Sequence, residues 1–103
     1  MKLMTKEIKD KLPPLYSQEK VKDPFIIVKF FTPWTNWTWY AIEGNPVGDN
    51  DFEFFGLVDG HEKELGYFML SELESVNGPF GLKIERDMYF GFEHHLSEVK
   101  GGS

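Results

Sequence analysis

Apolar residues near the beginning of the chain recur with the period of a helix. Ile8, Leu12 and Leu15 follow the spacing i, i+4, i+7, which places them on one helical face. Thr5 can accept a hydrogen bond from a free amide of the first turn, and Pro13 disfavours the helical conformation of the residue before it. The pattern therefore predicts a helix that is capped by Thr5 and ends at Leu12.

The next two thirds of the chain alternate between short apolar runs and turn residues, as in an antiparallel sheet. β-Branched and aromatic residues dominate residues 25–31, and their apolar side chains on both faces predict a central strand. Residues 37–42 follow a short connection and predict the second arm of a hairpin. Residues 44–51 predict a loop, and Gly56 predicts a bulge. Three further strands are predicted at residues 52–58, 65–70 and 84–92.

A second, short helix is predicted from Ser71 to about Val76. Ser71 and Glu74 have the spacing of a capping box, and Asn77-Gly78-Pro79 is typical of a helix end. The predicted fold is α+β: an antiparallel sheet of about five strands with an N-terminal helix and a short second helix. Residues 1–100 are expected to form a single domain, and 101–103 a flexible tail or a cloning remnant.

Length and composition limit the classes of protein to which the chain can belong. The chain has 103 residues and no cysteine, which excludes disulfides and thiolate metal sites. No run approaches the roughly 18 apolar residues of a membrane span, and the N-terminus lacks the apolar region of a signal peptide. We therefore expect a cytoplasmic protein without a membrane partner. The residues expected to be buried lie on the apolar stripes: Ile8, Leu12, Ile27, Val28, Phe30, Leu57 and Phe68.

Charge is distributed unevenly along the chain. Residues 1–30 hold seven lysines and four acids, whereas residues 31–103 hold four basic residues and thirteen acids, so the net charges are +3 and −9. The acidic body disfavours binding to a phosphate backbone. Acids gather around two predicted turns, at Asp49, Asp51, Glu53, Asp59, Glu62 and Glu64. If the two turns lay at one end of the sheet, they would form a negative patch suited to a basic protein surface.

Aromatic residues supply the strongest candidates for a binding surface. Tryptophan and tyrosine are enriched at interface hot spots, and they also form stacking platforms for single-stranded nucleic acid. Four aromatics lie close together in the sequence: Trp34, Trp37, Trp39 and Tyr40. Core packing is the expected role of at least two of them. Trp34 follows Pro33 between two strands and is expected to be exposed. The candidate binding residues are Trp34, Trp37, Trp39, Tyr40, Asp59, Glu62 and Glu64.

Candidate catalytic and metal-ligating groups are sparse. His61 and Glu64 are too few for a metal site, and the adjacent pair His94-His95 would point to opposite faces of a strand. Glu85 and Asp87 would share a strand face, where two carboxylates could act as an acid/base pair or hold Mg²⁺. No nucleophile elbow, phosphate loop or dinucleotide fingerprint is present. We therefore expect no catalytic residue, no metal and no cofactor.

Several short blocks occur in the order found in one bacterial family. The blocks are Lys11–Tyr16, Val28–Phe31, Asn36–Tyr40, Phe54–Val58, Glu64–Phe68 and Ile84–Asp87. Over roughly residues 3 to 98 the chain resembles the domain-of-unknown-function family 2958. The resemblance implies no activity. It implies a setting among small proteins of plasmids, phages and other mobile elements, and hence an accessory or anti-defence role.

The expected function is that of a non-catalytic interaction protein. It would bind a host protein of defence or of nucleic-acid processing, as an inhibitor or an accessory factor. Two alternatives stay open. One is binding of single-stranded nucleic acid through the aromatic surface, and the other is a small hydrolase that depends on carboxylates.

Overall fold

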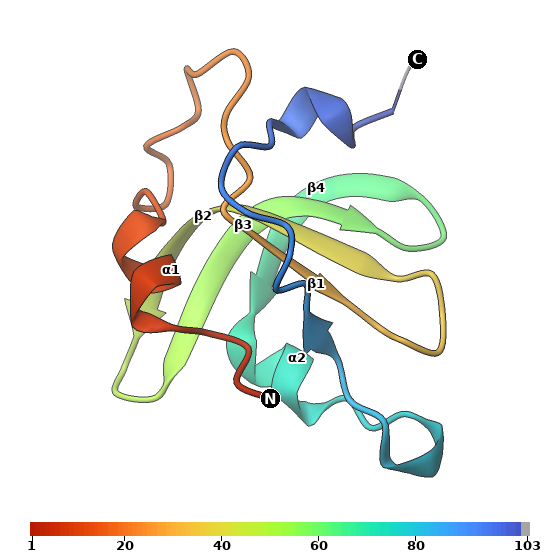
Figure 1. Cartoon of the computed structure of the whole chain (residues 1–103). Helices are drawn as coiled ribbons and strands as arrows, with labels where there is room; N and C mark the ends of the chain where they lie inside the picture. The colour runs from red at the N-terminus through yellow and green to blue at the C-terminus, as the bar shows by residue number, and fades with distance from the viewer. Residues whose placement is uncertain (102–103) are drawn as a thin grey trace.

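A computed structural model describes residues 1–101 of the chain. The sheet has five strands in the order β4-β3-β2-β1-β5, and each strand is antiparallel to its neighbours (Figure 1). The α+β prediction is confirmed. In chain order the elements are α1 (Lys6–Lys11), β1 (Val28–Phe31), β2 (Thr38–Val47), β3 (Asp51–Asp59), β4 (Lys63–Met69), α2 (Leu70–Ser75), the 3₁₀ turn η1 (Pro79–Gly81), β5 (Glu85–Arg86) and the 3₁₀ turn η2 (Leu96–Glu98).

The N-terminal helix forms where the sequence predicts it. The Thr5 hydroxyl accepts a hydrogen bond of 3.2 Å from the Ile8 amide, and Leu12 leaves the helical conformation directly before Pro13. Lys6 and Asp10 pair on the exposed side at 2.8 Å. Among the described residues no helix is long and apolar enough to span a membrane.

Residues 25–31 form a shorter and less central strand than predicted. Only Val28–Phe31 pairs with β2, and β1 lies one strand from the edge, beside the two-residue β5. Ile26 is fully buried in an apolar cluster with Leu57 and with Leu96 of the C-terminal segment. Its amide donates to the His94 carbonyl at 2.8 Å, which helps to hold this segment in place. Burial on both sides of this segment therefore does not require a central strand.

The predicted loop at 44–51 is wrong in its first half, because β2 continues to Val47 and turns at Gly48. The predicted bulge is present, but the extra residue lies on β2: the register shifts between Ala41 and Glu43, opposite Gly56. A Cβ atom on Gly56 would lie 1.8 Å from the Tyr40 carbonyl oxygen. Glycine on β3 thus accommodates a bulge on its neighbour.

The capping box predicted at Ser71 is wrong. Helix α2 begins one residue earlier, and Glu72 accepts from the Met69 amide at 2.8 Å. Ser71 instead contacts the beginning of β3, where its hydroxyl donates to Asp51 at 2.7 Å and its amide donates to the same carboxylate at 3.0 Å. This pairing lowers the pKa of Asp51, mainly through the hydroxyl of Ser71.

The strand predicted at 84–92 is wrong beyond Arg86. The Asp87 carboxylate accepts from the Tyr89 amide at 3.0 Å, and this turn directs the chain away from the sheet. Gly91 continues the irregular path with φ +76°. The alternating apolar residues after Asp87 therefore do not mark a strand.

Apolar clusters cover both faces of the sheet. Helices α1 and α2 pack on one face through Ile8, Leu12 and Leu73, against Phe30 and Phe54. The C-terminal segment covers part of the other face through Leu96, against Tyr40, Ile42 and Leu57. All seven residues predicted to be buried are buried.

Candidate functional site

The connection between β1 and β2, residues 32–37, is a tightly bonded loop that presents two tryptophans. The Thr32 amide donates to the Trp37 carbonyl at 3.0 Å, and the Thr35 amide donates to the Thr32 carbonyl at 3.3 Å. The hydroxyls of Thr32 and Thr35 also bond to each other. Thr32 is buried, so this network fixes the directions in which Trp34 and Trp37 leave the loop.

Trp34 packs against the loop that follows α2. A Cβ atom on Gly78 would lie 2.7 Å from the Trp34 ring, and Trp34 also contacts the main apolar cluster. The prediction that Trp34 is exposed is wrong, since residues 77–83 fold back across it and leave it partly buried.

Trp37 holds the turn between β3 and β4 in the same way. A Cβ atom on Gly60 would lie 2.4 Å from its ring, and the His61 ring meets it edge-on at 5.5 Å. Trp39 lies 6.0 Å from Trp37 and packs on the main apolar cluster. The two aromatic side chains therefore join the β1–β2 connection to the β3–β4 turn.

The loop at 77–83 carries an unusually exposed side chain at its apex. The Gly78 amide donates to the Leu82 carbonyl at 2.8 Å, and the Leu82 amide donates to the Pro79 carbonyl at 3.0 Å. Phe80 lies at the apex with φ 58°, a left-handed conformation that costs a phenylalanine roughly 1–2 kcal/mol. Its side chain is 101% exposed. We call the three joined loops, residues 32–37, 60–62 and 77–83, the tryptophan end.

Tyr40 does not belong to this end. It lies next to Trp39 in β2 but on the opposite face of the sheet, in the cluster beneath η2. Burial raises the pKa of the Tyr40 hydroxyl, and the carboxylates of Asp59 and Asp87 raise it further. The four predicted aromatics therefore do not form one continuous stacking platform.

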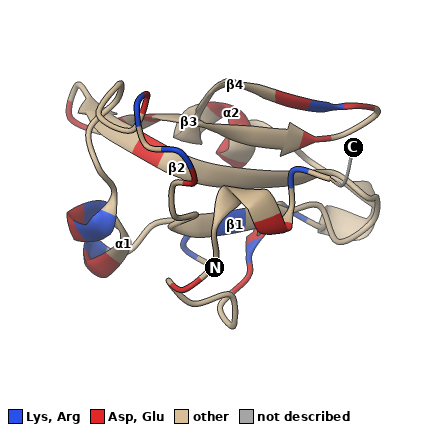
Figure 2. Cartoon of the chain, turned by 90° about the horizontal axis from the view of Figure 1, so that it is seen from above, with Lys and Arg blue, Asp and Glu red and all other residues tan. Residues whose placement is uncertain are grey.

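The predicted acids separate into two groups. The turns before and after β3 lie at opposite ends of this nine-residue strand, and Figure 2 shows acidic segments at both ends. One joint negative patch is therefore ruled out. Asp59, Glu62 and Glu64 lie at or beside the tryptophan end, whereas the other turn carries Asp49, Asp51 and Glu53.

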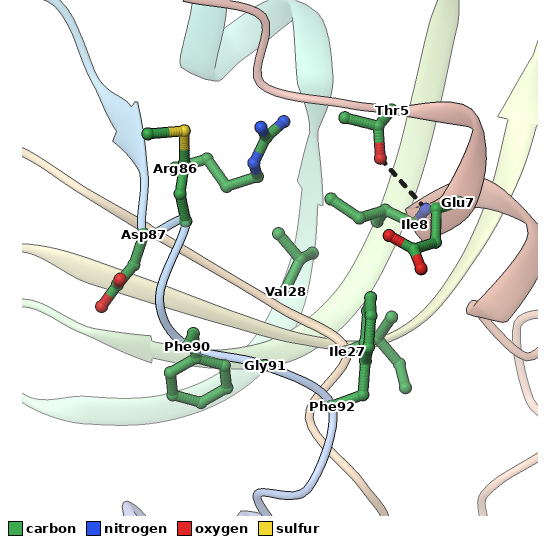
Figure 3. A pocket seen from close by; sticks show the side chains of 11 residues that line it. Thr5, Glu7, Ile8, Ile27, Val28, Arg86, Asp87, Phe90, Gly91 and Phe92 are labelled. Carbon is green, nitrogen blue, oxygen red and sulfur yellow. Dashed lines mark hydrogen bonds between the residues drawn. The ribbon is translucent and has the colours of Figure 1, made fainter.

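A small pocket of about 190 Å³ lies between the beginning of α1 and the segment after β5 (Figure 3). Ile27 and Val28 form part of its lining, with Glu7 and Arg86 among its charged residues. The Arg86 guanidinium donates to the Lys2 carbonyl at 2.7 Å, so part of its donor capacity serves to hold the N-terminus. Nothing in the spacing of the sequence predicts this pocket, because it joins residues more than 70 positions apart.

Of the two carboxylates considered for catalysis, Asp87 has structural partners and Glu85 lines a pocket. Asp87 pairs with Lys29 at 3.5 Å and also caps the turn at Tyr89. Glu85 lies with Lys29 and Tyr89 around a second pocket, of about 280 Å³. No described residues form a group of three or more metal-ligating side chains.

Histidines also have partners in the structure. The His94 ring bonds to Glu98 at 2.9 Å, and this contact raises the pKa of His94. The His95 ring packs on the Phe25 ring at a tilt of 35°, with 4.1 Å between ring centres. Alternation along a strand does not apply to this pair, because the segment is not a strand in the structure.

Comparison with models of protein families assigns the chain to a family. The sequence model of the family described as "Protein of unknown function (DUF2958)" matches residues 3–100, so the chain belongs to this family. Neither the curated proteins nor the solved structures contain a match to the chain.

Proposed function

We propose that this family member is a non-catalytic binding protein that recognises another protein through the tryptophan end. The observation that carries the proposal is Phe80, a fully exposed aromatic side chain at the apex of a short, hydrogen-bonded loop. The hydrogen-bonded loop fixes the backbone that carries this aromatic, which lowers the cost of ordering the loop on binding, and exposed aromatics are typical interface anchors.

The surroundings of Phe80 favour a protein surface as its target. Leu82 is 38% exposed in the same loop, and the partly buried Trp34 packs against the base of that loop at Gly78. Asp59 and Glu62 lie at the β3–β4 turn, which Trp37 joins to the same end of the sheet, and they add negative charge there. An apolar anchor beside acids suits a partner with an apolar pocket and a basic rim.

The resemblance to proteins of mobile elements adds the biological setting of the proposal. The partner is then a host protein of defence or of nucleic-acid processing in the cytoplasm, and binding either inhibits it or assists the element. An acidic end of this kind could occupy a groove that normally holds nucleic acid.

Affinity capture from a bacterial host lysate tests the proposal with two matched variants. Phe80→Ala removes the anchor, and Tyr89→Ala removes another aromatic, 93% exposed, from a different loop. We expect a captured protein that is retained by the wild type and by Tyr89→Ala and is lost with Phe80→Ala. Capture that disappears after nuclease treatment would favour the nucleic-acid alternative, and equal capture by all three proteins would overturn the assignment to this end.

A further inference from the structure

Strand β4 is an unpaired edge of the sheet. It pairs with β3 on one side, and within residues 1–101 no strand pairs with its other side. Natural edge strands are protected by charges, prolines or bulges. In β4 only Lys63 and Glu64 carry charge, and the five residues Leu65–Met69 include neither a charge nor a proline.

Exposed apolar side chains border this edge on one face. Leu65 and Tyr67 are 45% and 49% exposed and point to the same side of β4. Tyr67 lies 4.9 Å from Phe55 and 6.2 Å from Tyr16, measured between ring centres, and Tyr16 is 60% exposed. We call these four residues the tyrosine patch; it lies on the face opposite Trp39 and is distinct from the tryptophan end.

Gly66 lies in the middle of β4, and the space that a side chain would occupy there is open. A Cβ atom built on it meets no other atom within 4 Å, so packing inside the chain does not require glycine here. Glycine within a strand commonly marks a place where another backbone approaches closely. The free edge, the apolar side chains and the open centre coincide on one strand.

We infer that a second copy of this chain pairs with β4 in antiparallel orientation, with the two-fold axis at Gly66. In this register Leu65 of each copy lies opposite Tyr67 of the other, so the two apolar pairs form twice by symmetry. Lys63 lies opposite Met69, and Glu64 opposite Phe68, so no like charges face each other. The pairing covers the unprotected edge and joins the two tyrosine patches.

Charge gives this dimer a distinctive salt dependence. Each copy carries a net charge of −6, so the copies repel each other and added salt strengthens the pairing by screening. A basic partner at the tryptophan end would show the opposite dependence. The two inferences can therefore fail independently.

Sedimentation and cross-linking together test the dimer. We expect a monomer–dimer equilibrium at protein concentrations up to about 1 mM, with the dimer favoured as salt rises from about 50 to 500 mM. The chain has no cysteine, so a single introduced cysteine reports one contact. Residues opposite each other in an antiparallel pair have Cα atoms about 4.5–5.5 Å apart, within disulfide range. Gly66→Cys should therefore form a disulfide-linked dimer, whereas Val47→Cys, at the far end of β2, should not.

A charged residue on the edge provides the second test. Leu65→Lys places a lysine at a position that is already 45% exposed, so the monomer should stay folded, which its thermal unfolding checks. We expect at least about a tenfold rise in the dimer dissociation constant. A protein that stays monomeric under all these conditions overturns the inference. So does a dimer that Leu65→Lys leaves unchanged or that cross-links through Val47→Cys rather than Gly66→Cys.

Discussion

At the scale of single residues, glycines determine where the tryptophans can lie. The ring of Trp37 covers Gly60 and the ring of Trp34 covers Gly78, and in both places a Cβ atom would collide with the ring. Neither glycine has a positive φ, so the requirement is one of space rather than of backbone conformation. These contacts make the tryptophan end rigid, which in turn fixes the base of the loop that carries Phe80.

Gly60→Ala should therefore displace Trp37. The new methyl group lies 2.4 Å from the ring in the present geometry, and overpacking of this kind costs about 1–3 kcal/mol. Chemical denaturation measures the cost, and the Trp37 indole N–H resonance reports the displacement. Gly66→Ala is the matched control, since its methyl group meets nothing within 4 Å. Equal stability and unchanged indole resonances in both variants would show that Trp37 does not rest on Gly60.

Leu12 tests the packing of the N-terminal helix. It is 7% exposed and belongs to the main apolar cluster, so Leu12→Ala should cost about 2–5 kcal/mol in the free energy of unfolding. Urea denaturation gives the value, with the exposed Lys9→Ala as the control. A loss below about 1 kcal/mol would mean that α1 contributes little to the core.

The burial of single residues was predictable where the apolar residues of one helix or strand form a regular stripe that packs on the core. Ile8 and Leu12 follow the helical period, and Phe30 and Phe68 lie in clear strands, so local pattern was sufficient. Trp34 shows the limit of this reasoning. Its burial comes from residues 77–83, more than 40 positions away, and no local pattern records that contact.

At the scale of elements, a buried carboxylate accepts hydrogen bonds from the amides of a loop whose conformation the sequence pattern does not predict. Glu43, beside the β2 bulge, accepts from the Tyr16 amide at 2.8 Å and from the Gln18 amide at 2.7 Å, and its side chain is buried. The bulge aims this carboxylate at residues 13–18, so an irregularity in one strand positions a distant loop. The predicted strand at 84–92 failed for a related reason, since the Asp87 carboxylate forms a turn that apolar alternation does not reveal.

The C-terminal element should show a pH dependence from His94 and Glu98. The hydrogen bond with Glu98 raises the pKa of His94, and the same bond lowers the pKa of Glu98. Glu93 also faces the ring at 3.6 Å. The ion pair is therefore present while both groups are charged. Its contribution is lost as pH falls through the lowered pKa of Glu98, and again as pH rises through the raised pKa of His94.

Nuclear magnetic resonance titration of the histidines measures this effect. In the wild type we expect the pKa of His94 to lie above the ordinary value of 6.5, and in Glu98→Gln we expect it to fall. The glutamine can still accept from the His95 amide, so the turn at η2 should persist. The stability difference between the two proteins should also shrink as pH rises through the pKa of His94. An unchanged His94 titration in Glu98→Gln would contradict the pairing.

At the scale of the whole molecule, the sheet determines how the acidic charge can act. Because β3 runs between the two acidic turns, its length separates Glu62 and Glu64 from Asp49 (Figure 2). The uneven charge was evident in the sequence, but its division between two ends depends on strand pairing. Asp51 in addition serves to bind Ser71, so it belongs to the structural contacts of α2.

Charge reversal at one end or the other tests which acids steer a partner. For a partner identified by capture, the double variant Glu62→Lys, Glu64→Lys should lower the association rate by about tenfold and flatten its dependence on salt, because opposite potentials accelerate encounter. Asp49→Lys is the control: it is also exposed and acidic, but it lies at the other end of β3. Surface plasmon resonance between about 50 and 500 mM salt separates the association rate from the dissociation rate. If Asp49→Lys had the larger effect, the partner would approach the β2–β3 turn. If neither variant changed the association rate, steering by charge would be excluded, and binding at the tryptophan end would depend on Phe80 and its apolar neighbours.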